Sequence, residues 1–323
     1  MKWIECEYLV VIVNYRTPLD VVGCLRSLAS EVEFVGDVKV VVVDNFSEDG
    51  SVEIISGFIE REGWRSWVKV ISSGRNGGFS YGNNVAIKLS LASDRPAKVF
   101  HLLNPDTEVR PNSLKAIKLF FAAHEGVGIV GSRQVTESGD WNKAFRFPGI
   151  ASEFSRAVNL GLISRTLSAY EVARNMGDKP EQVDWVSGAS MAIRREVIDS
   201  VGLMDENFFL YYEETDFCLN ASRAGWQTWH VSDSVVFHKV GRSTGVTSEK
   251  SRNKGRLPSY VYESRAYFFA KNFGKTYAVL TDFSYLLGCT IGKLVCLITP
   301  KENNLNDGTV RDTLKFGVLR FFQ

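Results

Sequence analysis

Five short apolar runs, separated by segments with helical patterning, constrain the fold of this chain more than any other feature. The runs are "YLVVIVNY", "DVKVVVVDN", "WVKVIS", "AKVFHLLN" and "GVGIVGSR". Each is apolar on both faces, which is typical of strands covered on both sides, and strands that alternate with helices form parallel sheets. We therefore predict an α/β fold in which a central, mostly parallel sheet is flanked by helices.

The composition of the chain changes near residue 246. Before it, residues 135–182 have the character of loops and short helices, and "VDWVSGASMAIRREVIDSVG" predicts a further strand followed by a helix. Beyond it the pattern is basic and then apolar. We therefore place a first domain at residues 1–245 and a C-terminal helical extension at residues 246–323.

The C-terminal extension permits two interpretations. Residues 239–275 contain nine Lys and Arg against two Glu, a net charge of +7, and residues 277–298 are mostly apolar apart from Asp282 and Lys293. The two charges argue against a simple membrane-spanning helix. A basic segment beside an apolar helix favours peripheral contact with an anionic membrane, whereas a helix packed on the domain explains the pattern equally well.

The overall charge and the cysteines narrow the cellular setting. A formal net charge of +1 gives no general attraction to nucleic acid, so we expect no nucleic-acid partner. The five cysteines are an odd number without C-x-x-C spacing, which indicates neither a disulfide framework nor a zinc site. The first apolar run is too short for a signal peptide. We expect a cytoplasmic protein, peripheral on the inner face of the plasma membrane if the extension contacts it, and we leave a homodimer open.

Polar residues follow the predicted strands at their carboxyl ends. In an open parallel sheet, ligands bind beyond these ends. The glycines of "GRNGGFSYGNN" allow a ligand to approach the backbone closely, although they equally suit a tight turn into a helix. The candidate donor-binding residues at these ends are Asn14, Arg16, Asp44, Asn76, Gly77, Gly78, Asn83, Asn104 and Asp106. Asp44 is also typical of an Asx-turn or helix cap.

Asp106 and His238 are the candidate metal ligands. A strand-end carboxylate beside a diphosphate would hold Mg²⁺ or Mn²⁺, which take oxygen ligands. His238 ends the apolar run "SVVF", and a histidine in that position is otherwise structural. The pairing of the two residues favours the metal interpretation.

Three carboxylates within four residues form the most unusual motif, "YYEETDFC". Glu213, Glu214 and Asp216 lie beside aromatic residues at the start of an amphipathic pattern. A helix N-terminus stabilises negative charge, so a heavily charged first turn is one interpretation. Mutual repulsion and dry surroundings also raise a carboxyl pKa, which is what a general base requires.

The order of these motifs resembles that of the family 2 glycosyltransferases of the GT-A fold, a Rossmann-like nucleotide-diphospho-sugar transferase fold. "VVIVNYRT", "VVVVDNFSEDGS", "NGGFSYGNN", "LLNPDTEV", the segment from "VSGAS" to "RAGW", and "VVFHKVGRST" carry the resemblance over residues 8–245. The rhamnosyltransferase-like branch is the most similar. Six motifs in one order are more specific than any one of them.

The resemblance implies a role for each motif. Asp44 corresponds to the residue that reads the base of a UDP- or dTDP-sugar, Asp106 to a metal ligand of the D-x-D motif, and His238 to the histidine that completes the metal site. Glu214 takes the place of the general base that deprotonates the acceptor hydroxyl. Arg242 would help to stabilise the diphosphate leaving group. The residues implied to border the sugar or acceptor are Trp185, Ser187, Gly188, Glu213 and Asp216, with Trp185 equally suited to a core position.

Two departures from the family pattern are visible. Asn104 stands at the first acidic position of D-x-D, which weakens the expected metal affinity. Glu214 stands where the family has Asp, so its carboxyl must be set back by about one methylene. Neither change removes the chemistry of an inverting transfer, in which the acceptor oxygen attacks opposite the diphosphate leaving group.

Three functions remain to be compared at this point. The first is an inverting glycosyltransferase that moves a sugar, with rhamnose from dTDP-rhamnose as the first choice, to a cell-surface glycan or lipid-linked acceptor. The second is a non-catalytic nucleotide-sugar or glycan-binding protein, which would not need Asp106, Glu214 and His238 together. The third is a nucleotidyltransferase, for which "NYRTPLD" is a poor phosphate loop.

Overall fold

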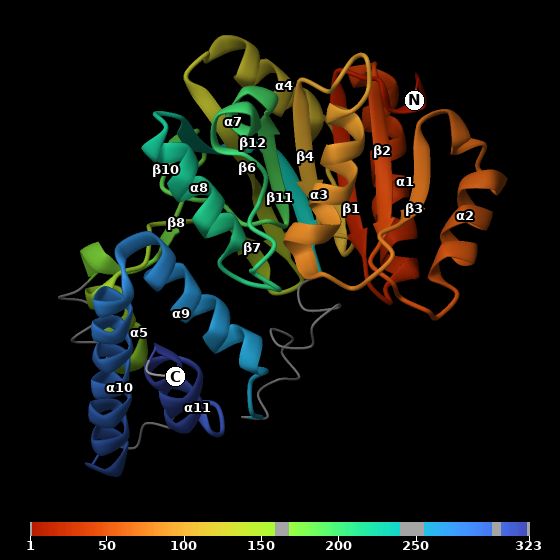
Figure 1. Ribbon diagram of the computed structural model, residues 1–323. Coiled ribbons are helices and arrows are strands. Elements are labelled where there is room, and N and C mark those ends of the chain that lie inside the picture. The colour runs from red at the N-terminus through yellow and green to blue at the C-terminus, as the bar shows by residue number, and fades with distance from the viewer. Residues whose placement is uncertain (1, 159–167, 240–254, 299–304, 322–323) are drawn as a thin grey trace. The chain divides into compact units, whose positions relative to one another are not determined.

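The structure is a computed structural model that describes residues 2–158, 168–239, 255–298 and 305–321 (Figure 1). The chain divides into two compact units. The sheet unit comprises Met1–Ala144, Asn175–Glu206 and Glu213–Gly245. The helical unit comprises Phe145–Arg174, Asn207–Tyr212 and Val246–Gln323. Segment 145–174 is therefore grouped with the C-terminal helices, although it is far from them in sequence.

The sheet unit is built on one large, mostly parallel sheet. Among the described residues ten strands join it, and its main path runs β10-β12-β6-β11-β4-β1-β2-β3. Neighbouring strands from β4 to β3 are parallel, as are β6 and β12, whereas β11 is antiparallel to both β4 and β6. The strands on this path are β1 (Tyr8–Asn14), β2 (Val38–Asp44), β3 (Val68–Ser72), β4 (Val99–Leu103), β6 (Val127–Thr136), β10 (Glu181–Val183), β11 (Ser190–Arg194) and β12 (Gln227–His238).

Short strands complete the β structure. β5 (Thr107–Val109) pairs with β12, and β7 (Gly139–Trp141) pairs with β6. β8 (Lys143–Phe145) and β9 (Ala173–Asn175) form a separate two-stranded sheet. All five apolar runs and the strand in "VSGASMAIRR" are therefore strands, which confirms the predicted mostly parallel sheet.

Both faces of the sheet are covered because successive strand residues point to opposite sides. Val10 and Ile12 of β1 belong to a core cluster with apolar residues of α1 (Pro18–Val35), α2 (Ser51–Arg61) and α4 (Ser113–Ala123). Val13 points to the other face, where α3 (Gly78–Leu91) packs so closely that a Cβ on Gly82 would lie 2.7 Å from Val13 Cγ1. The remaining helices of this unit are α7 (Arg195–Val201) and α8 (Glu213–Arg223).

Helices form the second unit. They are α5 (Ile150–Val158), α9 (Ser259–Phe273), α10 (Lys275–Ile298) and α11 (Thr309–Phe316), and α10 packs against both α5 and α9 (Figure 1). Gly288 allows the close approach of α10 to α5, since a Cβ there would lie 2.8 Å from Ala157 Cβ. Short 3-10 turns occur in both units. Those of the sheet unit are Lys2–Ile4 and Trp64–Ser66, and those of the helical unit are Ser168–Tyr170 and Val318–Phe321.

A buried ionic cluster joins three of these helices. Arg265 Nε donates to Glu153 Oε2 at 2.7 Å, and Arg265 Nη1 lies 2.8 Å from Asp282 Oδ1. All three side chains are at most 5% exposed. Burial still raises the pKa of Asp282 to about 6, against the opposing effect of Arg265. The cluster fixes the register of α5, α9 and α10, since leaving one of these charges without its partner would cost about 3–5 kcal/mol.

One described helix, α10, is long and apolar enough by length and composition to cross a membrane. Its qualifying segment is Lys275–Leu297, and 28% of the most apolar window is buried within the protein. The core helix of a soluble protein passes the same test.

Candidate active site

Asp44 ends β2 and lies in a dense hydrogen-bond network with the end of β1. Asn14 Nδ2 donates to Asp44 Oδ1 at 2.7 Å, and the Ser47 hydroxyl donates to the same oxygen at 2.6 Å. The Ser47 N–H donates to Asp44 Oδ2 at 3.1 Å, so the side chain of Asp44 closes a turn with the residue three positions later. Asp44 is 4% exposed, so the turn holds its carboxylate in a fixed orientation at the strand end.

The adjoining loops are connected to the same network. Asn14 Oδ1 accepts the Thr17 N–H, and Arg16, with a left-handed φ of 59°, donates from Nε to the Ser47 carbonyl at 3.2 Å. On the other side, Asn45 Nδ2 donates to Asn76 Oδ1 at 3.1 Å. The first loop after β1 and the glycine loop after β3 are therefore both bonded to the β2 end.

The glycine loop leads directly into α3. Gly78 has a left-handed φ of 84°, and a Cβ on Gly77 would lie 2.4 Å from Tyr81 Cγ, so a side chain at either position would strain the turn. Asn83, in the second turn of α3, is 1% exposed and donates to the Phe79 carbonyl. Asn83 Oδ1 has no hydrogen-bond partner among the described residues.

Asp106 and His238 come together at a second position on this edge of the sheet. His238 Nε2 lies 3.3 Å from Asp106 Oδ1, and the two side chains are 12% and 5% exposed. His238 Nδ1 lies 2.9 Å from Gln134 Oε1, so a proton on Nδ1 is donated to this acceptor. With the ring proton on Nδ1 alone, Nε2 can coordinate a cation beside the Asp106 carboxylate, whereas a protonated ring would donate from Nε2 to that carboxylate.

These donors fit a divalent metal ion. One carboxylate oxygen and one imidazole nitrogen converge, and the orienting bond from Nδ1 is the usual outer contact of a metal-bound histidine. Two protein donors leave positions for phosphate oxygens and water. No group of three or more His, Cys, Asp or Glu side chains within the described ranges could hold a metal by itself. The protein side of such a site is therefore incomplete without a ligand.

Glu213 and Glu214 open α8; Glu213 is buried, and Glu214 is half-buried with its Oε2 atom out of contact with solvent. The Gly188 N–H lies 3.4 Å from Glu214 Oε1, whereas the Oε2 atoms of both residues have no hydrogen-bond partner within the described part of the chain. Burial and then repulsion from Glu214 raise the pKa of Glu213 well above its ordinary value. Burial raises the pKa of Glu214 too, but backbone N–H groups of Glu214 and Gly188 oppose that rise. Glu214 is thus the member of the pair that ionises more readily.

The backbone before α8 is unusual. Tyr211 and Tyr212 have left-handed φ values of 72° and 70°, a conformation that costs bulky residues about 1–3 kcal/mol each. These two residues come directly before Glu213, the first residue of α8. Asp216, one turn further, is also buried and accepts a hydrogen bond from Asn220 Nδ2 at 3.1 Å.

A chain of contacts joins the carboxylate pair to both strand-end clusters. A Cβ on Gly188 would lie 3.1 Å from Phe79, which follows the glycine loop. The Asn104 N–H donates to the Ala189 carbonyl at 3.0 Å, which ties the loop before β11 to the end of β4. Because β11 is antiparallel to β4, its beginning lies at the same edge as the carboxyl ends of the parallel strands. That edge carries the predicted residues from Asn14 to His238.

Some predicted residues take a different place. Ser187 accepts the Ala189 N–H through its Oγ at 3.2 Å and so shapes the loop before β11. Trp185 is half-buried, so it belongs neither to the fully buried core nor to the open surface. Arg242 lies outside the described residues.

Gln134 contacts His238 and was not among the predicted site residues. It lies on β6, and its register partner is Val236 of β12, a pairing of which a single sequence contains no sign. Two residues visible at the end of β2 take specific places: Ser47, a candidate helix cap, holds Asp44, and Asn45 holds the glycine loop.

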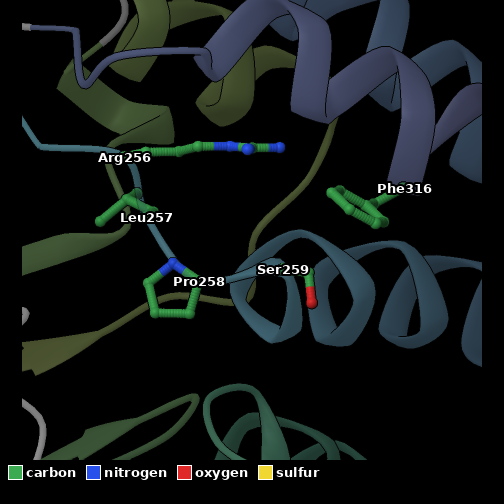
Figure 2. Close-up of a pocket in the computed structure, with 5 residues that line it drawn as sticks. All are labelled: Arg256, Leu257, Pro258, Ser259 and Phe316. Carbon is green, nitrogen blue, oxygen red and sulfur yellow. The ribbon is translucent and has the colours of Figure 1, made fainter.

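The helical unit contains a separate hollow of about 300 Å³. Figure 2 shows its lining residues, Arg256, Leu257, Pro258, Ser259 and Phe316. Arg256 already forms two hydrogen bonds with the carboxylate of Asp312, both at 2.7 Å. None of the predicted site residues lines this hollow, and its one charged group is paired, so it carries no part of the proposed chemistry.

Comparisons with known proteins identify the family of this chain. The family model described as glycosyltransferase like family 2 matches residues 6–256. Agl10 of Haloferax volcanii, a low-salt glycan biosynthesis hexosyltransferase, is 28% identical over 218 residues, which are 66% of this chain and 61% of Agl10. The chain thus spans less than two thirds of the length of that relative.

Two further proteins are similar. An N-acetylglucosaminyl-diphospho-decaprenol L-rhamnosyltransferase of Mycobacterium tuberculosis is 26% identical over 245 residues, covering 73% of this chain and 77% of the relative. Among solved structures, the mannosyltransferase PcManGT of Pyrobaculum calidifontis, in complex with GDP-Man and Mn²⁺, matches with a TM-score of 0.53 and 13% identity, covering 98% of this chain and 87% of the other. That likeness confirms the predicted GT-A fold.

The family model covers most of the chain and includes every described residue of the site, from Asn14 to His238. The chain therefore belongs to glycosyltransferase-like family 2, as the order of its motifs predicted.

Proposed function

We propose that this protein is an inverting glycosyltransferase that moves a sugar from a nucleotide-diphosphate donor to an acceptor hydroxyl. The observation that carries the proposal is the convergence of two kinds of group at one edge of the sheet. Asp106 and His238 face one another with donors suited to a cation, and Glu214 offers a buried carboxyl with a raised pKa. A binding protein would not need the second group.

Glu214 is the proposed general base. A carboxylate in dry surroundings holds a proton more strongly than one in water, which favours transfer from a hydroxyl. The acceptor oxygen attacks the anomeric carbon as Glu214 takes its proton, and the bond to the diphosphate breaks. One displacement inverts the configuration at that carbon.

The donor end is proposed to lie over β1, β2 and the glycine loop. The turn-held Asp44 carboxylate would accept an N–H from a pyrimidine base, and Gly77 and Gly78 would let the backbone approach the donor. A deoxythymidine diphosphate sugar with rhamnose is the first candidate, because the mycobacterial relative is named as a rhamnosyltransferase. UDP-sugars of other hexoses are the next.

Asp106 and His238 would hold the divalent metal, Mn²⁺ or Mg²⁺, with Asn104 as a neutral neighbour. When bound, the ion would supply positive charge to the departing diphosphate. The mixed oxygen and nitrogen donors suit Mn²⁺ better than Mg²⁺, which prefers oxygen. The proposed acceptor is a glycan or a lipid-linked saccharide, as the name of the mycobacterial relative suggests.

A donor screen tests the proposal. Purified protein is incubated with dTDP- and UDP-sugars and a saccharide acceptor, with Mn²⁺, Mg²⁺ or EDTA, and the released nucleotide diphosphate is measured. In the active pair, Glu214→Gln should lower kcat by about 10²–10⁴-fold while donor affinity stays the same, since proton removal is lost and binding is not. Glu33→Gln, on the exposed side of α1, is the matched control.

Two outcomes would contradict the proposal. Full turnover in Glu214→Gln would exclude that residue as the base, and retention of the sugar's anomeric configuration would exclude a single displacement. Nucleoside triphosphate consumption with pyrophosphate release would instead favour a nucleotidyltransferase. Donor binding without turnover across the screen would favour a non-catalytic binding protein.

A further inference from the structure

The outer face of α10 carries large apolar side chains that the helical unit leaves exposed. These five residues, called the α10 stripe below, are 52–81% exposed. On a helix of 3.6 residues per turn they fall within an arc of about 100°. The α10 stripe consists of Leu280, Phe283, Leu287, Leu294 and Leu297.

The opposite face of α10 is occupied by protein contacts. Asp282 lies 2.8 Å from Arg265, and Gly288 and Gly292 approach the backbone of α5. A helix that spans a bilayer among lipids is apolar on all sides, whereas this one has a single apolar outer face. The geometry therefore suits a helix that lies along a membrane surface while its inner face holds the unit together.

The charges of α10 indicate which surface would attract it. Its exposed charged residues are Lys275 and Lys293, which fall at nearly the same helical angle, on one edge of the α10 stripe. Its one acidic residue, Asp282, is 1% exposed. An apolar face with lysines at its edge is complementary to an anionic bilayer, whose negative surface potential attracts cations near it.

A second copy of the chain is the alternative partner for the α10 stripe. The α10 stripe has the 3–4 spacing of a coiled-coil seam, but such a seam is usually flanked by charged residues that pair across it. Here one edge holds Lys275 and Lys293, and the one acidic residue of α10, Asp282, is buried against Arg265, so the lysines would have no acidic partner on the α10 of a second copy. We propose that the α10 stripe binds the interface of an anionic lipid membrane, with α10 lying parallel to the surface.

This inference extends the proposed function, because a lipid-linked acceptor would be presented at that surface. It is tested without donor or acceptor, so its failure would leave the transferase proposal intact. The assay is co-sedimentation of the full chain with vesicles of phosphatidylcholine alone or with phosphatidylglycerol added, at low and high salt.

Two variants and a control decide the outcome. Leu287→Gln with Leu294→Gln should lower the partition onto anionic vesicles by at least about tenfold, since two large apolar groups no longer enter the interface. Lys275→Glu with Lys293→Glu should remove the preference for anionic vesicles and its salt dependence. Leu19→Gln with Leu119→Gln, at exposed leucines of α1 and α4, should bind like the parent protein.

Three results would overturn the inference. One is a parent protein that does not bind anionic vesicles, and another is equal binding by the α10 variants. The third is a parent dimer, measured by light scattering, that the leucine variant dissociates while vesicle binding is unchanged, which would assign the α10 stripe to a second copy. Circular dichroism verifies that each variant is folded. If the leucine variant is unfolded, the lysine variant still tests whether the α10 stripe binds anionic vesicles.

Discussion

Asp44 and Asp106 follow two strands that flank β1, and both are 4% exposed, yet their surroundings are opposite in character. Asp44 accepts hydrogen bonds from Asn14 and from both the hydroxyl and the N–H of Ser47. Asp106 Oδ1 lies 3.3 Å from His238 Nε2, and His238 Nδ1 lies 2.9 Å from Gln134 Oε1. One carboxylate is held by several hydrogen bonds from neighbouring residues, and the other lies beside an imidazole nitrogen.

At the same edge of the sheet, we therefore expect Asp44 to contribute mainly to stability and Asp106 mainly to chemistry. Removing the charge of Asp44 leaves buried donors without an acceptor, which costs free energy of folding. The Asp106 carboxylate has fewer hydrogen-bond donors around it than that of Asp44, with His238 Nε2 at 3.3 Å, so we expect removal of its charge to cost the fold less. Burial alone does not distinguish the two residues, whereas their partners do.

The largest expected effect is the loss of turnover in Asp106→Asn. A metal ion supplies several kcal/mol to a developing negative charge, so kcat should fall by about 10³-fold. The melting temperature should stay the same or rise, because the new amide N–H can donate to His238 Nε2. Nucleotide-diphosphate release and differential scanning calorimetry measure the two effects. A variant that melts well below the parent protein would show that Asp106 is structural.

The next effect concerns the residue behind His238. Gln134→Leu removes the acceptor for Nδ1–H, so the ring can rotate or change tautomer, and Mn²⁺ affinity should fall by about 10–100-fold. Electron paramagnetic resonance of free Mn²⁺ gives the affinity, and nitrogen chemical shifts of His238 report the tautomer. Gln182→Leu, at an exposed position on β10, is the control. If the tautomer of His238 were unchanged in Gln134→Leu, Gln134 would have no role in orienting the metal ligand.

Asp44→Asn tests whether the Asp44 carboxylate stabilises the fold. Its amide would place a donor against the donors of Asn14 and Ser47, and we expect a loss of about 1–3 kcal/mol in the free energy of unfolding. Urea denaturation measures that loss, and isothermal titration with the nucleotide diphosphate measures donor affinity. If Asp44→Asn is as stable as the parent, the observed turn does not depend on the carboxylate.

The smallest effect is expected at Glu213. Because its folded-state pKa is raised, the stability that protonated Glu213 provides is fully present below its ordinary pKa of 4.5 and is lost as pH rises through the raised value. Glu213→Gln cannot ionise, so its melting temperature should exceed that of the parent at pH 8 and match it below pH 4.5. An equal gap at all pH values would exclude ionisation as the cause.

The sequence predicted the sheet because burial on both faces leaves a clear mark, a continuous apolar run such as that of β1 or β2. It also predicted that Asp44 and Asp106 share one edge, since polar residues that follow such runs gather there, whereas Glu214 was predicted from three carboxylates at a helix start. The pairing of His238 with Asp106 was proposed from the motifs, and the structure places the two side chains 3.3 Å apart.

Other features depend on contacts between distant segments and leave no local pattern. The hydrogen bond from His238 to Gln134 joins residues 104 positions apart. The packing of α5 against α10 requires Gly288 at one point of close approach, and glycine in an apolar helix has no single meaning in a sequence. The left-handed conformation of Tyr211 and Tyr212 is likewise invisible, because aromatic residues rarely adopt it.

The reversed direction of β11 has a practical consequence for engineering. Because β11 begins at the edge where β4 ends, the loops that carry chemistry share one rim of the sheet. The opposite rim is left with connections such as Gly36–Asp37 between α1 and β2, or His124–Gly126 between α4 and β6. Asp37 and His124 are hydrogen-bonded to other segments, so insertions there should cost stability, whereas a fluorophore or linker attached at the exposed Glu125 should be tolerated and provides an attachment point at the rim opposite the site.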